Sequence, residues 1–328
     1  MTDRTETVEV LIEPADGGTH DTRVFRMRRR DGLPLPPYRP GSHIDVHLPN
    51  GLVRQYSLCG ADCHAPEYRI AVKRSPVSRG GSAWLHDQAS TGMALRIGLP
   101  RNAFALSDTA ACHLLIAGGI GVTPILSMAH ALHAAGRRYR FDYFARRDED
   151  VVFRDEITAA APLAAHTRLH LGLGPEMARE RVVTLLAGAA ADTHVYVCGP
   201  SAFMQMTVEL ARAALGDANV HQEAFSAPDL SGTEDREFEL RLEGRADAIA
   251  VPPGKSALAC LREAGVPVDS SCEVGVCGTC AMRVVAGELL HRDTYLTDDE
   301  RAAGTVFLPC VSRARSAVLV LAGAAADL

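Results

Sequence analysis

Four cysteines near the C-terminus constrain the fold of this chain more than any other feature. Three stand in the stretch CEVGVCGTC and the fourth in FLPCVS, which gives the spacing C-x4-C-x2-C followed by a distant partner: Cys272, Cys277, Cys280 and Cys310. This is the spacing of plant-type [2Fe–2S] clusters, and it differs from the paired C-x2-C motifs of common zinc sites. Glycines in the loop would let its backbone fold closely around a cluster and direct amide N–H groups at the sulfurs. The sequence therefore predicts a [2Fe–2S] site; the alternatives are a structural zinc site and a chance arrangement of reduced cysteines.

The composition limits the remaining possibilities. Of 328 residues, 47% are hydrophobic and 23% are charged, as in a globular protein of two or three domains. No apolar run approaches the roughly 18 residues of a membrane helix, and the polar start MTDRTETVEV is unlike a signal peptide, so we expect a cytoplasmic protein that does not bind membranes. Nine cysteines, an odd number, argue against a disulfide framework, and a net charge of −6 argues against a nucleic-acid partner.

The pattern of strands and turns changes along the chain and predicts three domains. Residues 1–105 contain short β segments separated by Gly and Pro, which predicts an antiparallel barrel. Residues 106–228 alternate strands with helices, which is typical of a doubly wound parallel sheet. After a polar linker at 229–235, residues 236–328 contain a hairpin, a helix, the cysteine loop and a further strand. This last order resembles the β-grasp fold of plant-type ferredoxins.

The segment RQYSL in the first domain has the R-x-Y-S-L pattern of the ferredoxin reductase superfamily. Arg54 can pair with a phosphate through two hydrogen bonds, and the ring of Tyr56 can lie along a flavin. The Ser57 hydroxyl suits a hydrogen bond near the reactive flavin atom N5, which makes it a candidate catalytic group, and Gln55 lies in the same strand. The pattern indicates a flavin site; an ordinary strand is the alternative.

A glycine-rich segment, RGGS, supports the flavin interpretation. Gly80, Gly81 and Ser82 open an expected helix, and a helix N-terminus with flexible glycines and a hydroxyl binds phosphate well. The segment follows a strand that contains Ala71 and Lys73, about where the same superfamily lines its flavin. The helix start and the arginine of RQYSL would hold one phosphate from two sides.

The second domain carries two turns that indicate a nucleotide site. The strand HLLIA leads into GGIGVTP and then a helix, the context that a dinucleotide-binding loop requires, although the form G-x-G-x-x-P departs from G-x-G-x-x-G. Its glycines would let the backbone approach a pyrophosphate, and its threonine would donate a hydrogen bond to the cofactor: Gly118, Gly119, Gly121 and Thr123. The motif CGP ends the strand VYVC, so we expect Cys198, Gly199 and Pro200 to bind cofactor, with Cys198 facing the nicotinamide as a catalytic group. A buried cysteine before a tight turn is an equally good interpretation of Cys198 alone.

These motifs occur in an order that makes nearly the whole chain resemble the phthalate dioxygenase reductase family. The resemblance implies FMN as the flavin, NADH as the electron donor and an oxygenase component as the acceptor. It also implies that Phe225, at the close of the second domain, covers the flavin ring until nicotinamide displaces it; a core position is the alternative. Arg146 and Arg147 follow the second strand of the nucleotide domain, where an NADPH enzyme would place charges for a 2′-phosphate, so NADPH stays open as a donor.

The predicted function is electron transfer from NADH to FMN, then to the [2Fe–2S] cluster, and then to a Rieske-type oxygenase. A flavin is needed because nicotinamide delivers two electrons together, whereas the cluster accepts one at a time. The enzymatic alternative is a cytochrome P450 as the acceptor. The non-catalytic alternatives are an iron–sulfur redox sensor and a zinc-bound scaffold protein. A monomer is compatible with the sequence.

Overall fold

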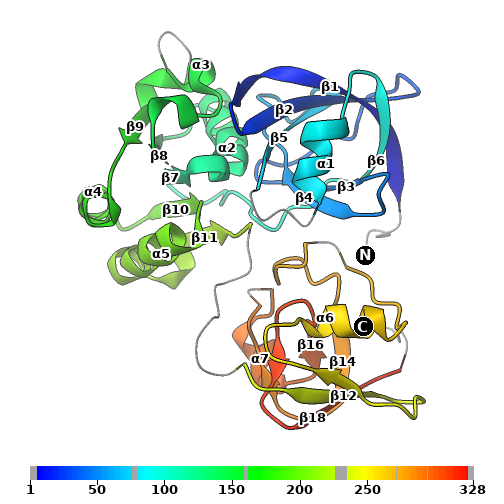
Figure 1. Ribbon diagram of the computed structural model, residues 1–328. Coiled ribbons are helices and arrows are strands. Elements are labelled where there is room, and N and C mark those ends of the chain that lie inside the picture. Colours follow the sequence, from blue (N-terminus) through cyan, green and yellow to red (C-terminus); the bar gives the residue numbers. More distant parts are fainter. Residues whose placement is uncertain are drawn as a thin grey trace. The chain divides into compact units, whose positions relative to one another are not determined.

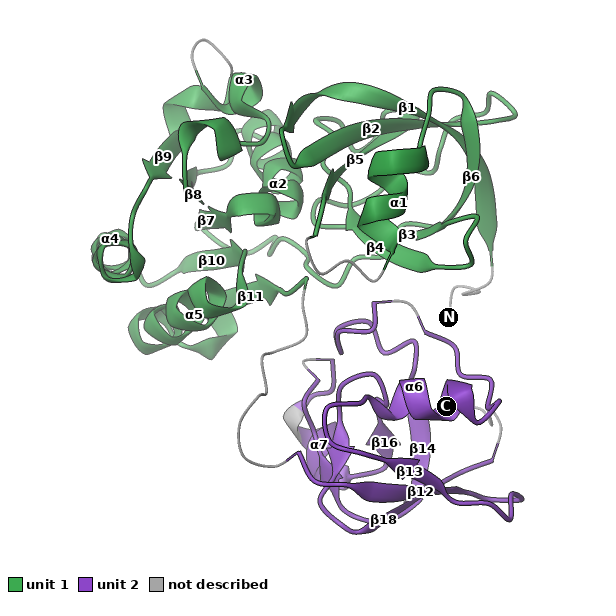
Figure 2. Cartoon of the chain, in the orientation of Figure 1, with its two compact units in different colours: residues 1–225 green, residues 226–328 purple. Residues whose placement is uncertain are grey.

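The chain forms two compact units, residues 1–225 and residues 226–328 (Figure 2). The first unit contains both the expected barrel and the expected parallel sheet, so the predicted boundary at residue 105 lies inside one compact unit and stays a prediction. The predicted linker at 229–235 lies outside the described residues except for Asp235. The computed structural model describes residues 6–75, 80–158, 162–225, 235–270, 272–293 and 295–323.

The first half of unit 1 is an antiparallel six-stranded sheet with the order β4-β3-β6-β1-β2-β5. Its two edge strands meet through a bridge between Leu58 and Ile70, which closes the sheet into the predicted barrel. Helix α1 packs on the barrel core through Leu85 (Figure 1). The elements are β1 (Thr7–Thr19), β2 (Thr22–Arg29), β3 (His43–His47), β4 (Val53–Ser57), β5 (Glu67–Lys73), α1 (Gly81–Gln88) and β6 (Met93–Gly98).

The second half of unit 1 is a five-stranded parallel sheet with the order β11-β10-β7-β8-β9. Helix α2 covers one face, and helices α4 and α5 cover the other (Figure 1). The chain runs outward from β7 through β8 to β9 and then returns to place β10 beside β7, so the topological switch point lies between β7 and β10. The elements are β7 (Cys112–Gly118), α2 (Val122–Ala134), β8 (Tyr139–Ala145), α3 (Arg154–Ile157), β9 (Thr167–Leu171), α4 (Pro175–Ala187), β10 (Thr193–Cys198), α5 (Ser201–Leu215) and β11 (Val220–Glu223).

Strand β7 shows why the apolar sequence HLLIA becomes the centre of this sheet. Leu114 and Ile116 pack with α4 and α5, whereas Leu115 and Ala117 pack with α2. A strand that is covered on both faces has a continuous apolar sequence rather than an alternating one. The glycine turn that follows β7 therefore starts from a strand held by two hydrophobic layers.

Unit 2 is a mixed five-stranded sheet with the order β13-β12-β18-β14-β16, and helix α6 packs on it (Figure 2). Strands β12 and β18 pair in parallel, and the other pairs are antiparallel, as expected for a β-grasp fold. The last helix, α7, begins with a capping box, because Thr297 and Glu300 exchange side-chain and backbone hydrogen bonds. The elements are β12 (Phe238–Leu242), β13 (Ile249–Val251), α6 (Ala257–Glu263), β14 (Met282–Ala286), β15 (Leu289–Leu290), α7 (Asp298–Ala303), β16 (Val306–Phe307), β17 (Arg313–Ala314) and β18 (Val318–Leu321).

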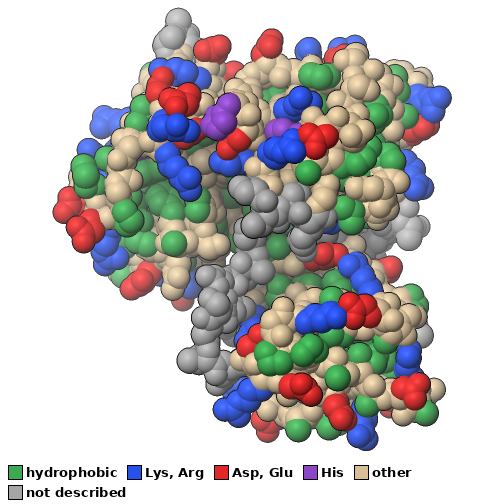
Figure 3. Space-filling view, in the orientation of Figure 1, with side chains coloured by type: hydrophobic (Ala, Val, Ile, Leu, Met, Phe, Trp, Pro, Cys, Tyr) green, Lys and Arg blue, Asp and Glu red, His purple; other side chains and the backbone are tan. Residues whose placement is uncertain are grey.

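The surface carries charges of both signs. Acidic and basic side chains are interspersed on the face seen in Figure 3. Within the described part of the chain, no helix is both long and apolar enough to cross a membrane.

Candidate functional site

The flavin motif RQYS lies on β4, next to the start of α1. The Arg54 side chain crosses this helix start: a Cβ added to Gly81 would meet Arg54 Nε at 2.8 Å. Gly80, the N-cap, has a φ of 94°, a left-handed conformation that glycine adopts without strain. Ser82 lies in the first turn, where its hydroxyl accepts a 3.2 Å hydrogen bond from the Ser75 amide. The guanidinium and the helix start therefore converge, as a phosphate clamp requires.

The other residues predicted to contact the flavin differ in their burial and in the partners of their side chains. Tyr56 is partly buried against the barrel core, which raises the pKa of its phenol, and Gln55 lies in the paired part of β4. The Lys73 ammonium lies 3.1 Å from Asp21 Oδ2, so its charge is already paired. Ala71 is buried in the core shared by the barrel and α2, which leaves only its backbone to contact a cofactor. These contacts engage the side chains of Ala71 and Lys73 elsewhere, and the flavin contacts of Tyr56 and Gln55 stay predictions.

The glycine turn and the CGP turn meet at the switch point of the parallel sheet. A Cβ added to Gly121 would lie 2.2 Å from the carbonyl oxygen of Cys198, and one added to Gly199 would lie 3.0 Å from Gly118 Cα. Gly119, in a 3-10 turn before α2, has a φ of 52°. The two motifs, which are far apart in sequence, thus form one surface at the carboxyl ends of β7 and β10. Open α/β sheets bind their ligands at this place.

Four residues of these turns and of the end of unit 1 were predicted to contact cofactors. The Thr123 hydroxyl donates to the Ile120 carbonyl at 3.1 Å and so stabilises the turn, and its hydrogen bond to a cofactor stays a prediction. The Cys198 thiol is fully buried, which raises its pKa and keeps it protonated. Pro200 is exposed at the start of α5. Phe225, two residues after β11, is 38% exposed, and its place over a flavin stays a prediction.

One hydrogen bond joins the barrel motif to the parallel sheet. Ser57 Oγ, at the end of β4, donates to Glu223 Oε2 at 3.1 Å. Glu223 is the last residue of β11 and pairs with Cys198 in the β10–β11 register. Its side chain is only 11% exposed, and burial raises the pKa of the carboxyl to about 7. Ser57, Glu223 and Cys198 therefore lie together between the two predicted cofactor sites.

Glu223 is not among the site residues that the sequence predicts. No motif surrounds it, and its only signal is its position two residues before Phe225. His43, opposite Ser57 in the β3–β4 register, places its Nδ1 atom 3.9 Å from Glu223 Oε1. Burial and the charge of Arg101 lower the pKa of His43 to about 4. The imidazole is therefore neutral near pH 7 and does not offset the burial of the Glu223 carboxylate.

The four predicted cluster cysteines lie in two close pairs in unit 2. Cys280 Sγ is 3.2 Å from Cys310 Sγ, and the thiols of Cys272 and Cys277 are hydrogen-bonded to each other. Within the described ranges, no three His, Cys, Asp or Glu side chains converge on a single metal ion. A binuclear cluster needs two thiolates on each iron, so two pairs are the arrangement that it requires. The donor set and its pairing fit a [2Fe–2S] cluster.

The glycines of the cysteine loop are required by its shape, as the sequence predicted. Gly275 has a φ of 79°, and a Cβ added to it would lie 2.6 Å from the Val311 side chain. Gly278 has a φ of 69°, and a Cβ there would lie 2.2 Å from the Tyr295 ring. Any larger residue at either position would both strain the backbone and displace a packed neighbour.

Hydrogen bonds within each cysteine pair make the two thiols unequal. The bond from Cys272 lowers the pKa of Cys277 to about 5, and the bond from Cys310 also lowers the pKa of Cys280. The pKa values of Cys272 and Cys310 are raised in turn. The Val274 amide donates to Cys272 Sγ at 3.4 Å, which is the predicted amide-to-sulfur contact. Iron binding would displace the remaining thiol protons, so cluster assembly should release protons.

The two arginines proposed to distinguish NADPH from NADH follow β8. Arg147 Nη1 lies 3.0 Å from Glu149 Oε1, and Arg147 Nε lies 3.3 Å from Asp150 Oδ2. Arg146 is exposed beside it. These carboxylates would compete with a 2′-phosphate for the Arg147 guanidinium, and the preference for NADH stays a prediction.

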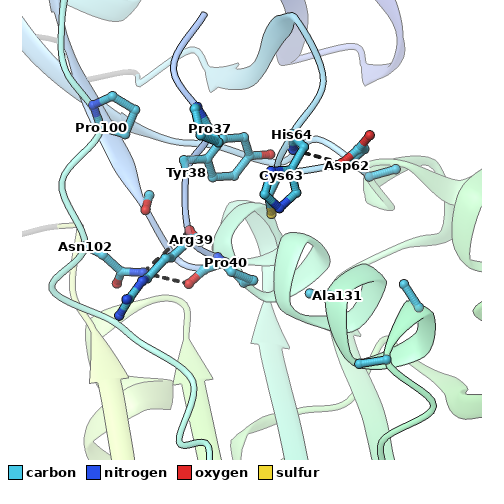
Figure 4. Close-up of a pocket in the computed structure, with 14 residues that line it drawn as sticks. Pro37, Tyr38, Arg39, Pro40, Asp62, Cys63, His64, Pro100, Asn102 and Ala131 are labelled. Atoms are coloured by element: carbon cyan, nitrogen blue, oxygen red, sulfur yellow. Dashed lines mark hydrogen bonds between the residues drawn. The ribbon is translucent and has the colours of Figure 1, made fainter.

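Unit 1 also contains a separate pocket of about 880 Å³ (Figure 4). Tyr38 and His64 line it from the barrel, and Ala131 lines it from α2. Asn102, at its edge, donates a 2.8 Å hydrogen bond to the Pro40 carbonyl. The pocket contacts the C-terminal end of α2, whereas the glycine turn precedes the N-terminal end, so the pocket is distinct from the predicted nucleotide site.

Known proteins resemble this chain over nearly its whole length. The family model of the 2Fe-2S iron-sulfur cluster binding domain matches residues 240–315, which include all four cluster cysteines. The model of the dimethylamine monooxygenase subunit DmmA-like N-terminal domain matches residues 93–220. The vanillate O-demethylase oxidoreductase of Pseudomonas sp. (strain HR199 / DSM 7063) is 41% identical over 315 residues, 96% of this chain and 99% of that protein. The predicted [2Fe–2S] domain is confirmed.

Two solved structures extend the comparison to the fold. Phthalate dioxygenase reductase, described as a modular structure for electron transfer from pyridine nucleotides to [2Fe–2S], has a TM-score of 0.76 and 38% identity, over 96% of this chain and 98% of its own. An intact type IV self-sufficient cytochrome P450 monooxygenase has a TM-score of 0.75 and 33% identity. The second likeness covers 96% of this chain but 41% of the P450 chain.

Proposed function

The chain belongs to the phthalate dioxygenase reductase family, and on this premise we propose that it oxidises NADH and passes single electrons through FMN and its [2Fe–2S] cluster to a Rieske-type oxygenase. Bound FMN takes up electrons in a pair and gives them up singly, which couples a two-electron donor to a one-electron cluster. The residues of the chain bind and orient these groups and hold a proton beside them.

The observation that carries this proposal is the hydrogen bond between Ser57 and Glu223. It ties the RQYS strand to the carboxyl end of the nucleotide sheet, next to Cys198. A nicotinamide and a flavin ring react only when their reacting atoms are held about 3–3.5 Å apart. A junction in which the flavin motif touches the nucleotide-binding edge supports such an arrangement.

Each motif has a distinct role in the proposal. Arg54 and the first turn of α1 would hold the FMN phosphate, and Ser57 Oγ would face the flavin. The turn at Gly119–Gly121 would hold the pyrophosphate of NADH. The Glu223 carboxyl, whose pKa burial raises to about 7, can take up or release a proton at Oε2, beside Ser57 Oγ, near neutral pH. The buried thiol of Cys198 would contribute to the shape of the nicotinamide pocket and would carry no charge there.

The proposed acceptor follows from the cluster type and from the relatives. Plant-type clusters have potentials of about −400 mV, low enough to reduce a Rieske centre. The likeness to an O-demethylase oxidoreductase and to a dioxygenase reductase favours an oxygenase component. A cytochrome P450 is the second candidate, because the same arrangement makes up 41% of a self-sufficient P450.

Anaerobic NADH titration of the reconstituted protein tests the electron route. NADH should bleach the flavin absorbance and produce the EPR signal of a reduced [2Fe–2S] cluster; the proposal fails if neither change occurs. Cys277→Ser should abolish reduction of cytochrome c, which takes electrons from the cluster, and largely spare reduction of ferricyanide, which can take them from the flavin.

A matched variant controls for the loss of a cysteine. Cys260→Ala removes a buried cysteine of the same unit outside the cluster set and should leave both reactions intact. Equal loss of both reactions in Cys277→Ser would mean that the loop serves folding instead. NADH oxidation coupled to product formation, with Rieske oxygenases and P450s compared as acceptors, separates the two candidate partners.

A further inference from the structure

Glu273, the residue after the first cluster cysteine, has a backbone conformation that is unfavourable for its type. Its φ is 56°, and among the described residues Phe153 is the only other non-glycine residue with a positive φ. A side chain with a Cβ is strained in this left-handed region, and such residues persist only where the surrounding structure holds them. Something in unit 2 must therefore hold Glu273 next to Cys272.

The contacts of the Glu273 side chain identify what holds it. Its Oε1 atom accepts hydrogen bonds from Arg262 Nη1 at 2.8 Å and from Ser270 Oγ at 3.2 Å. Arg262 Nη2 also donates to Ser270 Oγ, so the three side chains form a closed set. We call Arg262, Ser270 and Glu273 the arginine clasp. Arg262 lies in the last turn of α6, so the clasp fastens the cysteine loop to a helix packed on the sheet.

The clasp brackets Cys272, which lacks the packing that holds the inner cysteine pair. Cys280 and Cys310 are 3% and 8% exposed and lie in a hydrophobic cluster with Leu258 and Leu308. Cys272 is half-buried and lies outside that cluster. Ser270 precedes Cys272 by two positions and Glu273 follows it directly, so the clasp holds the backbone on both sides of this ligand.

We propose that Arg262 is a positioning residue for the iron–sulfur cluster: through Ser270 and Glu273 it fixes the backbone that presents the Cys272 thiolate. This proposal rests on the cluster assigned above. Residues that orient metal ligands without touching the metal commonly change metal affinity or activity when they are replaced. Because Arg262 is 47% exposed, its ion pair should add little to the stability of the whole unit. The effect should therefore appear in the cluster and not in global unfolding.

Five variants of the holoprotein test the proposal. Arg262→Ala should shorten the lifetime of the cluster under an iron chelator by about tenfold and alter its reduced EPR spectrum. Arg241→Ala, which removes an exposed partner of Glu239 on β12, is the matched control and should behave as the wild type. The single variants Arg262→Glu and Glu273→Arg should each lose the cluster quickly. The double variant that combines them should regain part of the cluster lifetime, because it restores a pair of opposite charges.

A second measurement works on the metal-free chain and separates this proposal from the proposed function. Alkylation of Cys272, mapped by peptide analysis, should be about threefold faster in Arg262→Ala than in Arg241→Ala, because the segment around Cys272 is locally loosened. The alkylation rate of Cys310 should be the same in both variants. The proposal is overturned if cluster lifetime and Cys272 alkylation match the control, or if the double reversal shows no rescue in either measurement. A wild-type chain that takes up no cluster would instead refute the proposed function, and the alkylation result would still decide whether the clasp acts on Cys272.

Discussion

The Ser57 hydroxyl donates a 3.1 Å hydrogen bond to the Glu223 carboxylate, and these residues are 166 positions apart in the chain. Glu223 ends β11, the edge strand of the parallel sheet, whereas Ser57 ends β4 of the barrel. The carboxylate is thus buried where the two sheets of unit 1 meet, with His43 as its other polar neighbour from the barrel. Ionisation of the Glu223 carboxyl therefore costs free energy, because the charge forms away from water.

The stability of unit 1 should fall as Glu223 ionises. Its pKa is about 7 in the folded chain against an ordinary 4.5, so between these values the folded state holds a proton that the unfolded state has released. The free energy of unfolding therefore decreases as pH rises from about 4.5 to 7, by about 3 kcal/mol in total. Glu223→Gln does not titrate, so its stability relative to the wild type should increase over this window.

Urea unfolding of the flavin-free chain at several pH values measures this effect. Trp84, the single tryptophan, lies on α1 and reports on unit 1 alone by its fluorescence. Glu209→Gln makes the same chemical change at an exposed position of α5, and its free energy of unfolding should vary with pH in parallel with that of the wild type. Parallel pH profiles for Glu223→Gln and the wild type would contradict the assigned burial.

Arg54→Ala should weaken the preference of the chain for FMN over riboflavin. The guanidinium lies across the start of α1, where the FMN phosphate would bind, and hydrogen bonds to charged groups contribute about 1.5–3 kcal/mol. FMN affinity should fall about 10- to 100-fold, while riboflavin, which has no phosphate, should bind as before. Flavin fluorescence titration measures both affinities. Lys73→Ala, whose ammonium pairs with Asp21, is the control. An Arg54→Ala chain that keeps the full wild-type preference for FMN would place the phosphate elsewhere.

Sequence reasoning succeeded where chemistry is encoded in local spacing. Three of the four cluster cysteines, the glycine turn and the start of α1 are each read within about ten residues, because backbone geometry requires glycine at positions such as Gly121 and Gly278. It missed Glu223, because burial of that carboxylate depends on which strand becomes the sheet edge and on what packs over it. For the same reason the sequence does not reveal that Lys73, a predicted flavin contact, pairs with Asp21, which only folding brings close. Its contact with a flavin stays a prediction.

The chain should prefer NADH, and releasing Arg147 should weaken that preference. Glu149 and Asp150 lie 3.0 Å and 3.3 Å from this guanidinium and compete with a 2′-phosphate for it. The double variant Glu149→Gln, Asp150→Asn should raise kcat/KM for NADPH by about tenfold, equivalent to about 1.4 kcal/mol, and change the value for NADH little. Asp217→Asn, which frees Arg212 on α5, controls for the lost charge. If both variants leave NADPH turnover unchanged, nucleotide choice is set elsewhere.

Gly121→Ala should separate the two turns that form the nucleotide-binding edge. Its Cβ would lie 2.2 Å from the Cys198 carbonyl oxygen and 2.6 Å from the Gly199 nitrogen, and because both are backbone atoms the turns must move apart. A misplacement of about 1 Å can slow a reaction about 100-fold, so stopped-flow reduction of the flavin by NADH should slow on that order. Reduction by dithionite, which needs no nucleotide site, should be unchanged. Gly174→Ala is the matched control, since its φ is −66° and no heavy atom lies within 4 Å of the added Cβ. Equal NADH rates in the two variants would show that the contact between the turns does not set the position of the nicotinamide.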